Sequence, residues 1–281
     1  MYLKAGERLT IRELLYGMLM VSGNDAATAL ACSTAGSVER FAVWMNQKAS
    51  ALGLTTAHFC NPHGLDAEGH CASALDLARI TAAAMEYDLF EQIVASKSVS
   101  IAGRTLVNHN KLLWLYEGTC GVKTGYTKST GRSLVSCCER DGMRLICVTL
   151  GAPNDWNDHM RLYDAAWSQY EQRTIVAAGE TLVQLPVMSG STPTVSVQAS
   201  DEICLPVMES EQVDIRLYLP QFVYADVRKG DILGEACVTV DGEVCGQTNL
   251  VAAADVCLDD AQRANWWEKW RLNFKLLFKN A

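Results

Sequence analysis

The first half of the chain carries apolar residues at helical spacing, interrupted by polar turns. Thr10-Ile11-Arg12-Glu13 has the form of a capping box, and the apolar positions that follow it predict a first helix: Ile11, Leu14, Leu15, Met18 and Leu19. Further helices are predicted over 25–32, from Ser37 to a stop at Gly53, and over 73–87. A later helix is predicted over 155–170, with its aromatic residues in the core.

Strand patterns follow these helices. Residues 98–101 and 105–107 predict two short strands that turn about Ala102-Gly103. Two longer apolar runs, 133–138 and 143–150, are joined through Asp141-Gly142, and this pair accepts the positive φ of a tight hairpin turn. Residues 121–127 directly precede the first of these runs. They are therefore expected on or beside the edge of an antiparallel sheet.

From about Arg173 the helical periodicity is replaced by short alternating runs, punctuated by prolines. The runs cover residues 182–187, 195–197, 213–219, 235–240 and 243–250. Asp241-Gly242 supplies a second hairpin turn. This pattern predicts a small all-β domain. The expected domains are thus 1–172, 173–258 and a separate segment over 259–281.

The last segment is amphipathic. Asp259 and Asp260 suit a helix start, and cations stand beside an aromatic face. The aromatic and apolar positions are Trp266, Trp267, Trp270, Phe274, Leu277 and Phe278, and the cations are Lys269, Arg271, Lys275 and Lys279. Such a helix lies in a membrane interface. The alternative, a helix docked on its own protein, explains the tryptophans but not the basic residues of an otherwise acidic chain.

Composition narrows the class of protein. The 281 residues are 49% hydrophobic, enough for a sizeable core and two domains, and the net charge of -8 argues against nucleic acid as a partner. No apolar run reaches the length of a plain membrane span, and the first residues show no secretory pattern. The 11 cysteines form no C-x-x-C pair and are expected as reduced, small core hydrophobes, which by itself favours a reducing compartment.

A loop over 58–71 gathers His58, His63, His70, two cysteines and an aspartate. These residue types bind metals, but their spacing matches no standard zinc pattern, and Asn-Pro and His-Gly are typical of turns. We expect no metal and no other cofactor.

Lys123-Thr124-Gly125 brings a cation, a hydroxyl and a glycine to the predicted sheet edge. Such an edge accepts an extended peptide as an added strand and holds its carboxylate. Ser22-Gly23-Asn24 lies about a hundred residues earlier. Taken alone, Lys123-Thr124-Gly125 is equally typical of a solvated strand end, and Ser22-Gly23-Asn24 is equally typical of a helix stop.

Together and in this order, the two motifs resemble those of the penicillin-binding serine acyl-transferases. The closer resemblance is to the D-alanyl-D-alanine carboxypeptidases of peptidase family S11, the penicillin-binding protein 5-like or DacF-like group. Residues 21–26, 51–54, 58–59, 63–66, 112–114 and 121–127 carry it. It implies a serine β-lactamase/transpeptidase-like α/β (α+β) domain, with an antiparallel sheet flanked by helices. A small all-β domain and a C-terminal amphipathic helix would follow.

The resemblance also implies roles for site residues. Ser22 would relay a proton, because a hydroxyl both donates and accepts. Asn24 would bond the substrate's backbone amide and help position the lysine base. Lys123 would set the positive potential, and Thr124 would bond the terminal carboxylate. Gly125 would let the substrate strand approach closely, and the N–H of Tyr126 would belong to the oxyanion hole.

One family motif is missing. Ser-x-x-Lys supplies the acylated serine and its base, and no serine in these 281 residues has a lysine three positions on. We therefore expect an N-terminally truncated chain, inactive as it stands. The complete protein would be exported and held on the outer face of the cytoplasmic membrane by residues 265–281. It would remove the terminal D-alanine of peptidoglycan stem peptides ending in D-Ala-D-Ala, with β-lactams as inhibitors.

Two alternatives stay open. A non-catalytic relative would hold muropeptide ends or β-lactams without cleaving them. A class A-like β-lactamase shares the Ser-x-Asn and Lys-Thr-Gly motifs. Residues 173–281 and the absence of a Glu-x-x-x-Asn segment count against that second alternative.

Overall fold

The computed structural model describes residues 1–259. The chain divides into two compact units after Ser168, and each is described by itself. The division falls four residues before the boundary expected from the change in pattern. Apart from Asp259, the predicted membrane-interface helix over 259–281 lies outside the described residues.

The first unit begins with a group of three helices. α1 (Ile11–Val21) starts at the predicted capping box, in which the Thr10 hydroxyl accepts from the Glu13 backbone and the Glu13 carboxylate accepts from the Thr10 backbone. α2 (Asn24–Ala35) is longer than predicted, and α3 (Val38–Ala51) starts directly after Ser37, the residue at which the third helix was predicted to begin. These three predicted helices are confirmed.

Four more helices complete this unit. α4 (Ala74–Ala84) has its own capping box between Ser73 and Asp76, and α5 (Asp88–Ala95) follows after a short turn. The single helix predicted over 73–87 therefore ends early, and α5 was not predicted. α6 (Leu112–Leu115) is one short turn. α7 (Asp155–Trp167) stops before Tyr170 because that residue begins a strand.

A three-stranded antiparallel sheet forms the centre of the first unit. Its order is β3 (Thr119–Thr127), β4 (Gly131–Arg140) and β5 (Met143–Thr149). The β4–β5 turn is the predicted Asp141-Gly142 pair, both at positive φ. β1 (Ser98–Ile101) and β2 (Arg104–Val107) form the predicted separate hairpin. Within residues 1–259, β3 pairs only with β4, so the predicted edge position of Lys123 is confirmed.

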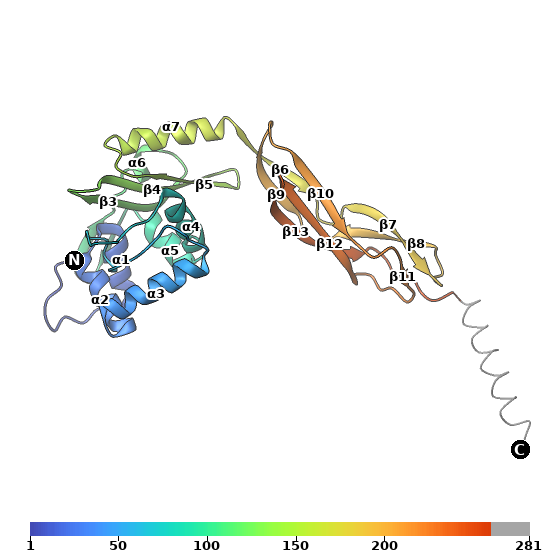
Figure 1. Cartoon of the computed structure of the whole chain (residues 1–281), viewed down its shortest axis with the longest axis horizontal. Coiled ribbons are helices and arrows are strands. Elements are labelled where there is room, and N and C mark those ends of the chain that lie inside the picture. Colours follow the sequence, from blue (N-terminus) through green and yellow to red (C-terminus); the bar gives the residue numbers. More distant parts are fainter. Residues whose placement is uncertain (260–281) are drawn as a thin grey trace, which may run out of the picture. The chain divides into compact units, whose positions relative to one another are not determined.

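Helices cover both faces of this sheet (Figure 1). On one face Met85, Val94, Val122 and Cys137 form a buried cluster between α4, α5 and the strands. On the other face α7 buries His159 and Tyr163 against β4. β3 packs against α5 through Val122 and Cys120, while its outer edge has no partner strand within residues 1–259.

The second unit is all β, as predicted. Its sheet has the order β10-β12-β13-β8-β7-β11, and β6 pairs with β9 beside it. The strands are β6 (Tyr170–Val176), β7 (Thr181–Met188), β8 (Thr194–Ala199), β9 (Ile203–Met208), β10 (Val213–Tyr218), β11 (Val223–Tyr224), β12 (Ile232–Val240) and β13 (Glu243–Ala252). Strands β6, β9 and β11 were not predicted, since β6 continues a helical pattern and β9 contains Pro206.

The cysteines only partly follow the expectation. All 11 are free thiols, but Cys137, Cys138 and Cys237 alone are buried. Four others are exposed, namely Cys32, Cys71, Cys245 and Cys257. The prediction that the cysteines act as small hydrophobic core residues therefore holds for only a minority of them. No helix in the described part of the chain is long and apolar enough to cross a membrane.

Candidate functional site

Ser22-Gly23-Asn24 forms the junction between α1 and α2. Ser22 ends α1 in the left-handed conformation, with φ 54° and ψ 42°, which a non-glycine residue adopts at some cost. Glycine suits position 23, because an added Cβ would lie only 3.1 Å from the Gly17 carbonyl oxygen, closer than most Cβ contacts. The tight junction turns the Ser22 hydroxyl out of the helix, and Asn24 starts α2 with its side chain exposed.

The junction faces β3. The Lys123 ammonium donates hydrogen bonds to the Ser22 hydroxyl and, over 2.7 Å, to the Thr124 carbonyl oxygen. These contacts join two motifs that are separated by about a hundred residues of sequence. Burial lowers the pKa of Lys123 to about 8, because the charged form is partly removed from water.

All six predicted site residues line one cleft of about 1490 Å³. Ser22 and Asn24 lie on the helical side, and Lys123 to Tyr126 lie along β3 on the other. Tyr126 is 70% exposed, so the outer end of the strand is open to solvent. Lys123, which contacts Ser22, therefore lies on a strand whose outer edge has no partner strand among the described residues.

His109 also lines the cleft, although no role was predicted for it from the sequence. Its backbone N–H donates to the Met20 carbonyl at 3.0 Å. Burial, followed by the nearby charge of Lys123, lowers its pKa. The side-chain amide of Asn108 positions the turn by donating to two carbonyls at the end of α5, those of Val94 in its last turn and of Ser96, its C-cap. The Asn-His-Asn triplet ahead of an apolar run was the available signal.

Arg132 and Trp156 form one rim of the cleft and were also missed. The Arg132 guanidinium makes two 3.0 Å hydrogen bonds to the buried Asp155 carboxylate and lies 5.4 Å from the Trp156 ring centre. Trp156, predicted as core, is therefore a rim residue. Arg132 pairs with Tyr126 across β3 and β4, a position that only the strand register reveals.

The loop over 58–71 contributes another wall. Phe59, His63 and His70 line the cleft, and His58 pairs with Cys71 to close the loop. The His70 ring accepts a backbone hydrogen bond from Cys60 at 3.0 Å, so its nitrogen serves the loop itself. Among residues 1–259, no three His, Cys, Asp or Glu side chains converge to hold a metal.

Both units match known protein families. Residues 1–154 match the model of D-alanyl-D-alanine carboxypeptidase, peptidase family S11. Residues 170–257 match the C-terminal domain of penicillin-binding protein 5. These matches favour neither the β-lactamase nor the non-catalytic alternative.

Individual relatives of the chain are also D-alanyl-D-alanine carboxypeptidases. The chain is 32% identical over 266 residues to D-alanyl-D-alanine carboxypeptidase DacF of Bacillus subtilis, covering 91% of this chain and 68% of that one. It is 31% identical to DacC of Escherichia coli, covering 91% and 66%. The chain thus spans about two thirds of the length of these relatives.

Solved structures share the fold. Penicillin-binding protein 5 of Haemophilus influenzae has a TM-score of 0.71 at 28% identity, covering 92% of this chain and 77% of its own. Penicillin-binding protein 3 of Streptococcus pneumoniae, described as a peptidoglycan synthesis regulatory factor, has a TM-score of 0.74 at 27% identity, covering 88% and 78%. The chain therefore belongs to the D-alanyl-D-alanine carboxypeptidase family of serine hydrolases, peptidase family S11.

Proposed function

We propose that the cleft is the peptide-binding half of a serine-type D-Ala-D-Ala carboxypeptidase site. The observation that carries the proposal is the Lys123–Ser22 hydrogen bond at the open edge of β3. It puts a cation and a relaying hydroxyl where a strand-like peptide would end. The substrate would be a peptidoglycan stem peptide ending in D-Ala-D-Ala, and β-lactams would occupy the same place.

Each site residue receives a role in this proposal. Lys123 attracts the terminal carboxylate and Thr124 bonds it, while Ser22 relays the proton to the leaving amine. Asn24 bonds the substrate amide, and Gly125 keeps the strand edge free of a side chain. The backbone N–H of Tyr126 stabilises the oxyanion of the tetrahedral intermediate.

The reaction also needs a nucleophile and its base. No serine among the 281 residues stands three positions before a lysine. The proposed acyl-enzyme therefore requires a serine and a lysine from a segment outside these residues. In this proposal, that segment would lie against the cleft beside Ser22 and Lys123.

The proposal also places the protein on the outer face of the cytoplasmic membrane. Its support is the sequence of residues 265–281, which contains three tryptophans together with four cations. The last described residues, 256–259, belong to the all-β unit, so residues 265–281 follow this unit in the chain.

The test is D-alanine release from a synthetic peptide ending in D-Ala-D-Ala. The Ser-x-x-Lys segment of the Bacillus subtilis relative would be joined ahead of Met1. We expect this chimera to release D-alanine, and Lys123→Ala to lower kcat/KM by about 100-fold, as for loss of a group that stabilises developing charge. Lys128→Ala, at an exposed turn position, is the matched control and should change little. A folded chimera that neither releases D-alanine nor takes up penicillin would end the proposal.

A further inference from the structure

Three apolar side chains are exposed together in the all-β unit. We call Met188, Phe222 and Tyr224 the exit patch; they are 48%, 42% and 69% exposed. The rings of Phe222 and Tyr224 meet edge to face, 5.5 Å apart. Tyr224 pairs with Met188 where β11 joins β7. The three residues therefore form one continuous surface.

The patch is held outward by its backbone. Leu219 and Val223, which flank Phe222, pack into the core cluster that contains Val187. From Phe222 to Val227 exposed residues alternate with more buried ones, and this strand periodicity turns Phe222 and Tyr224 outward. Water-exposed aromatic rings on a rigid backing are typical of surfaces that contact another apolar phase.

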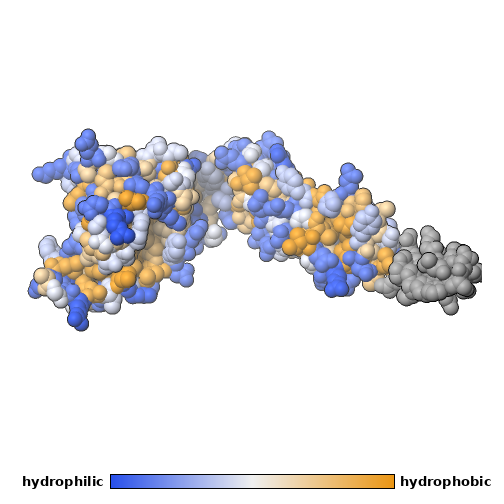
Figure 2. Space-filling model, turned by 60° about the horizontal axis from the view of Figure 1, so that its bottom comes forward, coloured by the Kyte–Doolittle hydropathy of each residue, from blue (hydrophilic) through white to orange (hydrophobic). Residues whose placement is uncertain are grey.

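The patch borders the point where the described chain ends. The N–H of Asp259 donates to the carbonyl of Ser189 at 2.9 Å, and Ser189 follows Met188. The N–H of Leu258 donates to Asp226, two residues after Tyr224, at 2.6 Å. Figure 2 shows hydrophobic surface over this part of the all-β unit. Residues 260–281, with their aromatic and basic sequence, continue from this place.

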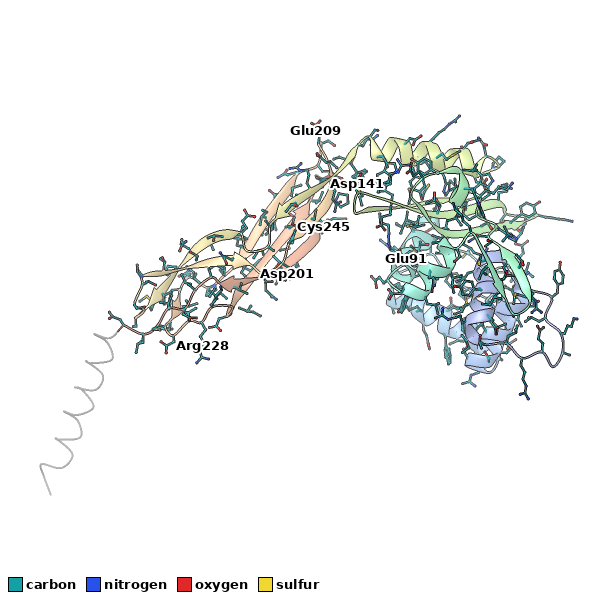
Figure 3. The ribbon with its side chains drawn as sticks, turned by 180° about the vertical axis from the view of Figure 1, so that it is seen from behind. Glu91, Asp141, Asp201, Glu209, Arg228 and Cys245 are labelled. Carbon is teal, nitrogen blue, oxygen red and sulfur yellow. The ribbon has the colours of Figure 1, made fainter. Side chains whose placement is uncertain are left out.

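Charge at this end is mixed. Arg228, labelled in Figure 3, and Lys229 are exposed. Asp231 accepts the backbone N–H of Arg228 at 2.8 Å, and Asp255 that of Lys229 at 2.7 Å. With carboxylates beside the cations, the patch has apolar area but no strong positive field. Its contacts should therefore depend little on the charge of a lipid headgroup.

We propose that the exit patch is a second lipid contact, inserted into the interfacial layer of a bilayer beside residues 260–281. The Tyr224 ring, with its polar hydroxyl end, favours that layer, while Phe222 and the flexible Met188 add apolar area for the acyl chains. This inference rests on the proposed membrane placement. It assigns part of the membrane binding to the folded all-β unit and the rest to residues 260–281.

The experiment is sedimentation of the full 281-residue chain with large phosphatidylcholine vesicles. We expect the variant Phe222→Ser/Tyr224→Ser to partition about tenfold more weakly, since two half-exposed rings lose part of the free energy of burial. Tyr87→Ser, which changes a 63% exposed tyrosine of the first unit, is the matched control and should partition unchanged. Equal melting curves would show that the patch variant is folded.

Each outcome decides. If the unaltered chain does not bind vesicles, the membrane placement and this inference both fail. If it binds and the patch variant binds equally well, only this inference fails.

Hydrogen exchange distinguishes whether lipid or residues 260–281 of the chain itself cover the exit patch. We expect amides of 222–226 to gain protection only when vesicles are added. Protection that is present without lipid and lost when the chain stops at Asp259 would show that residues 260–281 cover the patch, and would overturn the proposal.

Discussion

A buried histidine of α7, His159, makes the stability of the first unit sensitive to mild acid, because it packs against β4 and β5. His159 is completely buried, with its two ring nitrogens 2.6 Å from the Ser136 hydroxyl and 2.9 Å from the Thr149 hydroxyl. Burial lowers its pKa to about 4, against an opposing effect of Asp155 and Asp158. The folded state therefore keeps this ring neutral where the unfolded chain protonates it.

The size of the effect follows from linkage. The pKa of this histidine in the unfolded chain lies near 6.5. Between pH 6.5 and 4 the unfolded state therefore binds more protons, and the free energy of unfolding decreases as the pH is lowered. From pH 7 to pH 5 the loss is about 2 kcal/mol, and by pH 4 about 3 kcal/mol. Carboxylates with lowered pKa values, such as Asp25 and Asp76, lose their contribution only below this window.

The test compares the chain with His159→Gln at pH 7, 6 and 5. Glutamine has a donor and an acceptor but does not titrate, so the variant should be less stable at pH 7 yet lose about 2 kcal/mol less on going to pH 5. His70 and His109, whose pKa values are also lowered, remain in both chains and cancel.

Urea unfolding would be measured by pulsed hydrogen exchange of peptides from β4 and α7, so that only the first unit is read. Parallel pH profiles in the two chains would refute the argument. A free energy of unfolding that rises as the pH falls would also refute it.

Three further predictions concern the same unit. Binding of an N-acylated D-Ala-D-Ala peptide should weaken about tenfold between pH 7 and 9 as Lys123, whose pKa is about 8, loses its charge; titration calorimetry would show the step, and its persistence in Lys123→Met would contradict the assignment. Ser136→Ala should cost about 2 kcal/mol or more, because its hydroxyl serves both His159 and Tyr163, whereas Tyr163→Phe should cost about 1 kcal/mol; the reverse order in urea unfolding would be inconsistent with this network. Gly121→Ala should cost about 1–3 kcal/mol, because its Cβ would lie 2.8 Å from Val94 Cγ2; a double-mutant cycle with Val94→Ala should show partial relief, and simple additivity would argue against the clash.

The sequence predicts this fold best where local chemistry and packing agree. The capping box at Thr10, the helix start at Ser73 and the Asp-Gly turns at 141–142 and 241–242 are predicted element ends that the structure confirms. These signals act over a few residues and need no tertiary partner. The separation of α4 from α5 has no such signal, because helical residues continue through the break.

The site likewise has features that local sequence predicts and features that depend on the tertiary fold. The two motifs are visible as short strings, but the Lys123–Ser22 contact depends on how α1 is placed against β3. His109, Arg132 and Trp156 reach the cleft through turn geometry and strand register. A register fixed by partners far along the chain cannot be read from local pattern alone.

The most direct test of the proposed site locates the residue that penicillin acylates. The chimera carrying Ser-x-x-Lys and the 281-residue chain would each be treated with benzylpenicillin and analysed by intact mass and peptide mapping. The proposal predicts one adduct, on the serine of Ser-x-x-Lys, and none on the 281-residue chain. An adduct on Ser22 would contradict it, because Ser22 would then be the nucleophile and Lys123 its base.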